Sequence, residues 1–310
     1  MNGATRCQAA NRESAVAHLF IKRQSGKFVL WVEGPDDCVV FERFAAPTCC
    51  VKDLSCKHDV RVAVKEAISA RLGGFAGLVD RDFEDISPDT IVPRLAFISR
   101  RYNDLEACML ASTAGELMKD LVRRDAKSDI PWLSSDCFQT PAQLLVEWPV
   151  SVVGAIRKAW VGRTTKLDRN GYCIDSMIDL LAPCQEPTIE QVSKALSAAA
   201  GLGSSESDRI AADALRMRKR SEPWALVRGK DLVRAIAYVL SRAGDACYYP
   251  FGQDGAPKAV EIFQRKIQER VVTLFDIEAL RAAGTEEALR AALTTTDEPP
   301  DRYLCFGHAS

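Results

Sequence analysis

Short apolar runs alternate with helical patterns over the first hundred residues of the chain. Four of these runs have the length of strands and cover residues 28–32, 49–54, 75–79 and 95–98. Between them, apolar positions recur at helical spacing after Gly34 and again over residues 57–72, where Gly73 and Gly74 end the pattern. Strand, helix and strand alternating at this spacing predict an α/β fold, with a central parallel sheet flanked by helices.

Beyond the first four strands, helical patterns replace the strand pattern. Prolines separate these patterns, which cover residues 114–124, 142–160, 189–200, 207–219 and 231–242. A further pair of helices is expected at residues 260–275 and 277–293. We therefore expect four regions, which are an N-terminal helical arm at 1–27, an α/β core at 28–110, a large helical region packed on the core at 111–245 and a C-terminal helical tail at 246–310.

Acidic residues directly follow two of the predicted strands. Glu33 comes after the first strand with Asp37 about one helical turn beyond it, and the third strand is followed by Asp80 and Asp82. Because ligands gather at the carboxyl ends of parallel strands, we expect these four carboxylates to converge. Carboxylate oxygens suit Mg²⁺ or Mn²⁺, which can act on a phosphate group. The alternative is that each acid only caps a helix or is solvated in a loop.

Composition and charge narrow the classes of partner. The net charge is −1, so any contact with nucleic acid has to come from a local basic cluster, such as Arg94, Arg100 and Arg101 or the run at residues 216–220. Such clusters are more often solvated helix faces. No apolar run approaches the roughly 20 residues of a membrane span. Eleven cysteines without a Cys-x-x-Cys pair, and only three histidines, favour free thiols in a cytoplasmic protein.

The acidic motifs resemble those of the Toprim family, the catalytic fold shared by topoisomerases, bacterial primases and OLD-type nucleases. Its signature is a Glu-Gly pair and a nearby acid after the first strand, then Asp-x-Asp after a later strand; here these are Glu33-Gly34, Asp37 and Asp80-Arg81-Asp82. Segments 32–37, 79–83, 104–106 and 228–232 resemble one bacterial Toprim-like family of phage-defence effectors, which includes the Toprim subunit of PARIS. The resemblance covers about residues 28–240.

The resemblance implies a role for each matching residue. Glu33 would bind metal or act as the base, and Asp80 and Asp82 would be metal ligands. Asp37 would be the second acid of the OLD-type pattern, and Lys230 would stabilise the phosphate as a lysine does in OLD-type nucleases. Two further acids, Asp104 and Glu106, either extend this site or serve as a helix cap and a solvated side chain.

These implications lead to two hypotheses about function. The first is a Mg²⁺-dependent nuclease that hydrolyses phosphodiester bonds in DNA or RNA as an anti-phage effector, since the tyrosine domain of topoisomerases and the zinc module of primases are both missing from the pattern. The second is a Toprim-derived module that binds an ATPase or nucleic acid without cutting it. By resemblance, an ABC-type ATPase is an expected partner, and whether the chain forms a homo-oligomer stays open.

Overall fold

The computed structural model describes residues 26–84, 92–121, 150–160, 203–242 and 256–294, together with residues 17, 19, 191 and 194. The chain divides into two compact units, of which one comprises Met1–Arg100 and Asp276–Ser310 and the other Arg101–Phe275. The sequence placed the end of the α/β core at residue 110 and assigned a separate tail from residue 246. Those bounds stay predictions; in the division into compact units, the first segment of the sheet unit ends at Arg100 and the helices after Asp276 belong to that unit.

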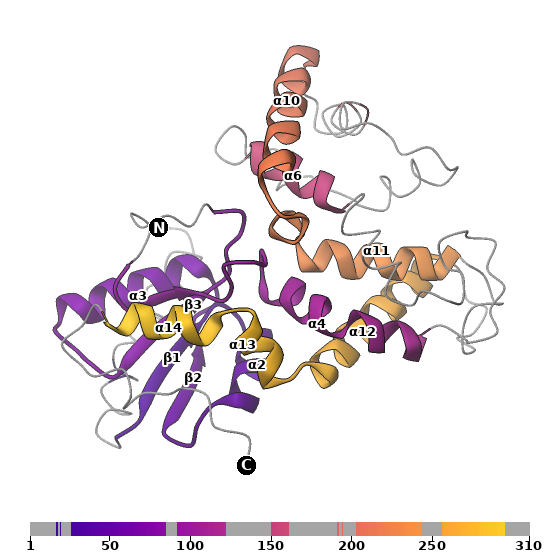
Figure 1. Ribbon diagram of the computed structural model, residues 1–310. Helices are drawn as coiled ribbons and strands as arrows, with labels where there is room; N and C mark the ends of the chain where they lie inside the picture. The colour runs from indigo at the N-terminus through magenta and orange to yellow at the C-terminus, as the bar shows by residue number, and fades with distance from the viewer. Residues whose placement is uncertain are drawn as a thin grey trace, which may run out of the picture. The chain divides into compact units, whose positions relative to one another are not determined.

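A four-stranded parallel sheet forms the centre of the first unit (Figure 1). Its strands are β1 (Phe28–Val32), β2 (Cys49–Asp53), β3 (Phe75–Val79) and β4 (Leu95–Phe97), in the order β2-β1-β3-β4. In the register of the central strand, Leu30 lies opposite Val51 on one side and Ala76 on the other. The predicted α/β fold with a parallel sheet is therefore confirmed, and the predicted strands agree with those observed to within a residue at their ends.

The connections between the strands make the edge between β1 and β3 the place where a ligand is expected. Helix α2 (Pro35–Phe44) connects β1 to β2, and α3 (Lys57–Ser69) then crosses back past β1 to reach β3. The connection that leaves β1 therefore runs towards β2, and the connection that leaves β3 runs the opposite way, towards β4. Parallel α/β sheets bind ligands at such a reversal, outside the carboxyl ends of the strands. The residues that follow β1 and β3 are therefore the first to consider as a site.

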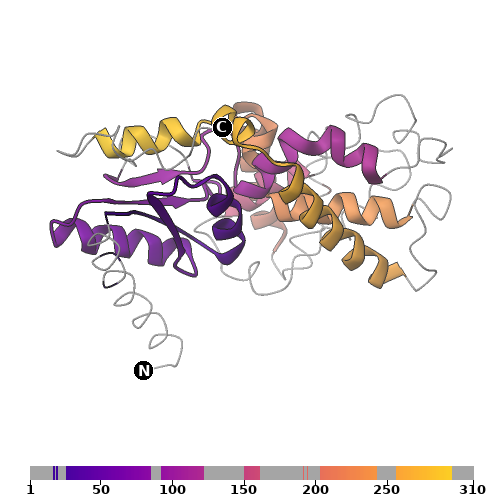
Figure 2. The same cartoon turned by 90° about the horizontal axis from the view of Figure 1, so that it is seen from below.

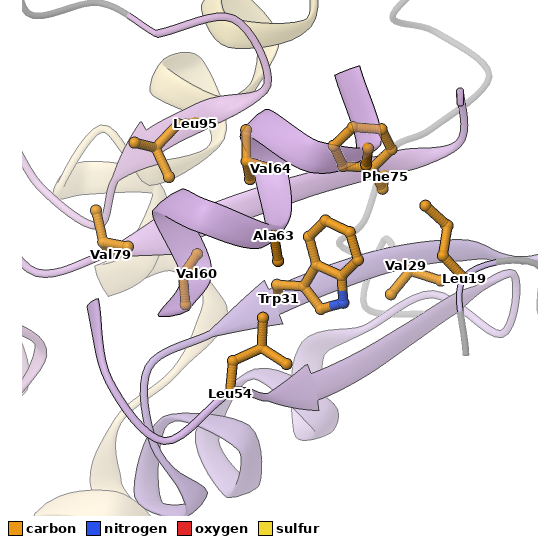
Figure 3. Close-up of a cluster of buried hydrophobic side chains, with 11 residues drawn as sticks. Leu19, Val29, Trp31, Leu54, Val60, Ala63, Val64, Phe75, Val79 and Leu95 are labelled. Carbon is orange, nitrogen blue, oxygen red and sulfur yellow. The ribbon is translucent and has the colours of Figure 1, made fainter. Parts of the chain in front are cut away.

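The core below this edge consists of apolar side chains from β1, β3 and α3 (Figure 3). Trp31 and Phe75 are fully buried there, with ring centroids 5.0 Å apart. Gly77 on β3 allows α3 to come close, since an added Cβ atom would lie 2.8 Å from methyl groups of both Val60 and Val64. The close packing of this helix on the strands fixes where its first turn lies relative to the sheet edge.

Two C-terminal helices complete the first unit. They are α13 (Ile277–Ala282) and α14 (Thr285–Thr294), separated at Gly284, whose φ of +81° ends the first helix. The prediction of one continuous helix at 277–293 is therefore wrong. Helix α14 packs against β3 and β4, and the carbonyl of Ala292 accepts the N–H of Arg94 at 3.0 Å. Figure 2 shows α14, in yellow, and α3, in purple, on opposite sides of the sheet.

The second unit is helical throughout the part that the structure describes. Its elements are α4 (Leu105–Leu121), α6 (Ser151–Trp160), α10 (Ser204–Arg220), the short 3₁₀ helix η4 (Pro223–Leu226), α11 (Gly229–Arg242) and α12 (Ala256–Leu274). Helix α10 packs on α6, and α11 packs on α4 and α12. Residues 114–121 continue α4 instead of starting a new helix, and most of the helix expected at 189–200 lies outside the described residues. No described helix is long and apolar enough to cross a membrane.

Candidate functional site

Glu33 joins the ends of the two central strands. It follows β1 directly, and its Oε1 accepts the backbone N–H of Asp80, the first residue after β3, at 2.7 Å. The two acidic motifs, separated by 47 positions in the chain, are therefore adjacent at the reversal of the sheet. Because this hydrogen bond fixes one carboxylate oxygen, the orientation of the Glu33 side chain is set by the backbone of the neighbouring strand.

Burial raises the pKa of Glu33 from an ordinary 4.5 to about 7. The hydrogen bond from Asp80 opposes this rise, the negative charges of Asp82 and Asp37 add to it, and the positive charge of Lys57 opposes it. A carboxyl group with this pKa exchanges a proton near neutral pH, as a general base should. The same surroundings favour a cation, because a positive charge would relieve the repulsion among these acids.

Asp37 lies in the first turn of α2. Its Oδ2 accepts the backbone N–H of Gly34 at 3.0 Å, which satisfies a donor at the start of the helix. Its charge nevertheless contributes to the raised pKa of Glu33. Asp37 thus acts as the cap that the alternative interpretation expected, while remaining close enough to Glu33 to affect its ionisation.

The loop after β3 turns sharply and presents Asp82. Asp82 and Phe83 have φ values of 48° and 65°, in the left-handed region that few non-glycine residues adopt. The N–H of Glu84 closes the turn by donating to the carbonyl of Arg81 at 3.0 Å. The side chain of Asp82 is 52% exposed. Left-handed residues in succession are uncommon and concentrate at ligand sites and switch regions, which supports a functional role for this loop.

Lys57 is the residue at this edge that sequence reasoning missed. It is the first residue of α3, and its ammonium lies 3.0 Å from the carbonyl oxygen of Arg81, 3.3 Å from Asp82 Oδ2 and 3.0 Å from Glu84 Oε1. Only 14% of its side chain is exposed. The signal was available, because Lys57 begins a helix that follows β2 and so starts at the same sheet edge as Glu33.

Arg61 lies one turn further along α3 and holds the same loop. Its Nη2 lies 2.6 Å from Glu84 Oε2, so Glu84 binds Lys57 with one oxygen and Arg61 with the other. Burial acts to raise the pKa of Glu84, but the hydrogen bonds from Arg61 and Lys57 outweigh it and lower that pKa below 4.5. Glu84 therefore stays ionised at neutral pH and anchors the loop to α3.

The four predicted metal ligands do not form a closed cage. Among the described residues, no group of three or more His, Cys, Asp or Glu side chains could hold a metal ion. Mg²⁺ does not require such a group, because it usually keeps several waters and binds one or two carboxylates together with substrate phosphates. Glu33, desolvated among like charges, and the exposed Asp82 are donors of this kind. Binding of Mg²⁺ by these residues together with a substrate therefore stays a prediction.

Asp104 lies in the second unit and is a helix cap. Its Oδ1 accepts the N–H of Ala107 in the first turn of α4 at 2.8 Å, and its two oxygens lie 3.0 and 2.9 Å from the N–H of Gly229, the first residue of α11. The side chain is buried, and burial followed by the charge of Glu106 raises its pKa to about 7. Of the two alternatives for Asp104, the structure therefore shows the cap.

Glu106 and Lys230 pair with each other next to this cap. Lys230 Nζ lies 3.5 Å from Glu106 Oε1, and the Lys230 side chain is 54% exposed. Gly229 is required for the contact, because an added Cβ atom would lie 2.3 Å from Glu106 Cβ and 2.4 Å from the nitrogen of Ala107. Lys230 and Glu33 belong to different units, so the role of Lys230 in the reaction stays a prediction.

Arg94, a member of the predicted basic cluster, has a structural role instead. It is 6% exposed, its Nη1 donates to the carbonyl of Phe75 at 3.2 Å, and its guanidinium lies 4.9 Å from the centre of the Phe75 ring. A guanidinium buried in this way cannot contact a phosphate backbone. The other basic run ends α10, where Arg218, Lys219 and Arg220 occupy the last turn, a position that favours cations in any helix.

Comparison with models of known protein families gives no match to this chain, and comparison with the curated proteins gives none either. The function has to be argued from the residues of the site. The strongest of these observations is the contact between Glu33 and the backbone of Asp80 at the carboxyl edge of the sheet.

Proposed function

We propose that this protein is a magnesium-dependent nuclease of the Toprim type. The observation that carries the proposal is Glu33, a partly buried carboxyl group with a raised pKa that contacts the start of the Asp80–Asp82 loop where the sheet reverses. Parallel sheets bind ligands at this position, and carboxylates placed there suit a hard cation and a phosphate. Hydrolysis of phosphodiester bonds in DNA or RNA is the reaction class that these residues support best.

Each residue of the edge has a part in this proposal. Asp82 would hold the ion, with Asp37 and Asp80 beside it, and Glu33 would either join these ligands or act as the base. Bound Mg²⁺ supplies charge neutralisation at the scissile phosphate and a more acidic water. Glu33, oriented by the N–H of Asp80, is the residue placed to accept a proton near neutral pH. Asp37 holds the start of α2 against this edge through its bond to the N–H of Gly34.

The biological setting follows from the resemblance to phage-defence effectors. We propose that the protein acts in the cytoplasm on nucleic acid, in partnership with an ABC-type ATPase that keeps it inactive until infection. Because such an effector can be silent when purified alone, the first experiment should measure binding of the metal and not only cleavage. Cleavage can then be assayed with both DNA and RNA substrates.

A second function, a binding module that does not cut, is favoured by a specific observation. The described residues contain no group of three metal-binding side chains, and the ammonium of Lys57 lies beside Asp82 and Glu84. An acidic edge neutralised by a lysine can be a structural feature that a non-catalytic descendant retains. This module would bind nucleic acid or an ATPase without any dependence on divalent metal.

Replacement of Glu33 by glutamine separates the two functions. The amide oxygen of glutamine can still accept the N–H of Asp80, so the fold should be retained, while the charge is lost. Asp36→Asn is the matched control, because Asp36 is exposed, lies in the first turn of α2 and carries the same charge. We expect calorimetric titration with Mn²⁺ in the presence of a short oligonucleotide to show binding by the wild type and Asp36→Asn, with at least tenfold weaker binding by Glu33→Gln.

Cleavage provides the second measurement. Plasmid DNA and total transfer RNA are incubated with each variant in Mg²⁺ or in EDTA, with and without the ATPase partner where one is found. Glu33→Gln should be inactive in every condition in which the wild type cuts. Equal metal binding and equal cleavage by the wild type and Glu33→Gln would refute the nuclease, and binding of nucleic acid unaffected by EDTA would support the module.

A further inference from the structure

The ammonium of Lys57 lies among oxygen atoms of the acidic edge. The loop after β3 contributes three of these oxygens, from the carbonyl of Arg81 and the carboxylates of Asp82 and Glu84, at 3.0 to 3.3 Å. Phe97, on β4, lies below with its ring centre 5.7 Å from the ammonium. Carbonyl and carboxylate oxygens around a positive charge are the surroundings that a hard metal ion would also select.

The position of Lys57 is unfavourable for a lysine unless the acidic edge compensates. The first turn of a helix carries the positive end of the helix dipole, which repels cations. Burial of an ammonium costs further free energy when it is not paired. Both costs are offset by Asp82 and Glu84, so the position of Lys57 depends on these two acids. Its charge also acts on Glu33, whose pKa it lowers.

The two partners of Lys57 differ in how they are held. Glu84 has a second cation, Arg61, 2.6 Å from its other oxygen, so Glu84 stays anchored to α3 even without Lys57. Asp82 lies at the left-handed turn and is half-exposed. Arg61 contacts Oε2 of Glu84 and not Asp82, so Asp82 lacks this second anchor. A ligand arriving from solvent can therefore replace Lys57 at Asp82 without releasing the whole loop.

We propose that Lys57 is an internal counter-ion that competes with the divalent metal for Asp82. Without metal, its ammonium neutralises Asp82 and keeps the loop in place; when metal binds, the ammonium gives up Asp82 and remains beside Glu84. The inference rests on the proposed function, since it assumes a metal at this edge. It makes Lys57 a positioning residue that sets how tightly the metal binds and does not assign it a chemical step.

The test compares two variants that remove the same charge from the same helix. Lys57→Met removes the competitor of Asp82, and Arg61→Met removes the neighbouring cation that contacts only Glu84. Calorimetric titration with Mn²⁺, again in the presence of a short oligonucleotide, should show binding by Lys57→Met that is tighter than wild type by about fivefold, the factor that corresponds to a pair of this exposure. Arg61→Met should stay within about twofold of the wild type, and Lys57→Arg, which keeps the charge, should not gain affinity.

A spectroscopic measurement on the wild type tests displacement directly. Lysines carrying ¹³C-methyl groups are followed by NMR while Mg²⁺ is added to the protein mixed with the same oligonucleotide, with the Lys57 signal assigned by its loss in Lys57→Arg. We expect this signal to shift on metal addition in the wild type and to stay in place in Asp82→Asn. Thermal unfolding of the metal-free variants checks that the altered affinity does not result from partial unfolding.

The outcomes distinguish this inference from the proposed function. If the wild type binds metal, and Lys57→Met and Arg61→Met change the metal affinity equally, the change comes from overall charge alone. This result would overturn the competition between Lys57 and the metal and leave the proposed nuclease intact. Unchanged affinity in Lys57→Met would overturn it as well. Absence of metal binding in the wild type and in every variant would remove both proposals. Binding by Lys57→Met alone would support the competition.

Discussion

Replacement of Asp104 by alanine removes the acceptor of two backbone N–H groups at the starts of two helices. Asp104 accepts from Ala107 in α4 and from Gly229 in α11, and it is buried. Loss of a helix cap costs about 1 kcal/mol, and each buried donor left without a partner costs about 1–3 kcal/mol. We therefore expect Asp104→Ala to lower the free energy of unfolding of the second unit by about 3 kcal/mol at pH 5.

Asp104→Asn should behave differently, because its amide oxygen can still accept both N–H groups. The pKa of Asp104 is raised by burial from 3.8 to about 7, so the folded state holds a proton that the unfolded state releases. The contribution of this group to stability is therefore present below pH 4 and is lost as the pH rises towards 7. The slope is at most about 1.4 kcal/mol per pH unit for one proton. Asp104→Asn removes this slope.

The assay is urea unfolding between pH 4.5 and pH 8, followed by tryptophan fluorescence. Four of the five tryptophans lie in the second unit, so fluorescence reports mainly on it. Relative to the wild type, Asp104→Asn should gain stability as the pH rises, and Asp208→Ala, an exposed acid on α10, should follow the wild type at every pH. Parallel pH profiles for the wild type and Asp104→Asn, or an Asp104→Ala as stable as Asp208→Ala, would refute this account.

Two further predictions concern the sheet unit. Gly77→Ala should lower the melting temperature, at a cost of about 2 kcal/mol, because its Cβ atom would lie 2.8 Å from Val60 and Val64. Gly203→Ala, where nothing lies within 4 Å, is the steric control; it lies in the second unit and should cost at most about 1 kcal/mol, because Gly203 is the N-cap of α10. Equal melting temperatures for the two variants would contradict the packing argument. Glu33→Gln should make unfolding less dependent on pH between 5 and 7, since the pKa of Glu33 is raised to about 7 and ionisation in this range disfavours the folded state. A wild-type pH profile in Glu33→Gln would rule out that assignment.

The strands and the meeting of the two acidic motifs could be predicted because both depend on local patterns. An apolar run of five residues followed at once by Glu33 or Asp80 indicates a buried strand and the edge at which it ends. Parallel topology then brings the two ends together without any knowledge of side-chain contacts. The structure adds the hydrogen bond from Asp80 to Glu33, which the pattern could not specify.

The features that escaped prediction depend on contacts between distant segments. Asp104 and Gly229 are 125 positions apart, and nothing in either segment alone indicates that one caps the helix of the other. The break at Gly284 is ambiguous in the sequence, since an apolar pattern continues across it and a glycine inside a helix is tolerated. The pairing of Lys57 with Asp82 depends on a left-handed turn whose residues, Asp82 and Phe83, carry no strong signal for it.

The segments that resemble the phage-defence family serve two different purposes in this chain. Those after β1 and β3 place Glu33 and the Asp80–Asp82 loop together at the carboxyl edge of the sheet. The other two meet in the second unit, where Asp104 caps a helix that begins at Gly229 and Glu106 pairs with Lys230. This contact explains both segments by packing, so their resemblance to the family requires no catalytic role for Lys230. A reaction on phosphate still benefits from a cation beside the carboxylates, and within the sheet unit Lys57 is already bound to Asp82. The phosphate-binding role of Lys230 therefore stays a prediction, and Lys57 is the cation whose contacts place it beside the acids of the sheet edge.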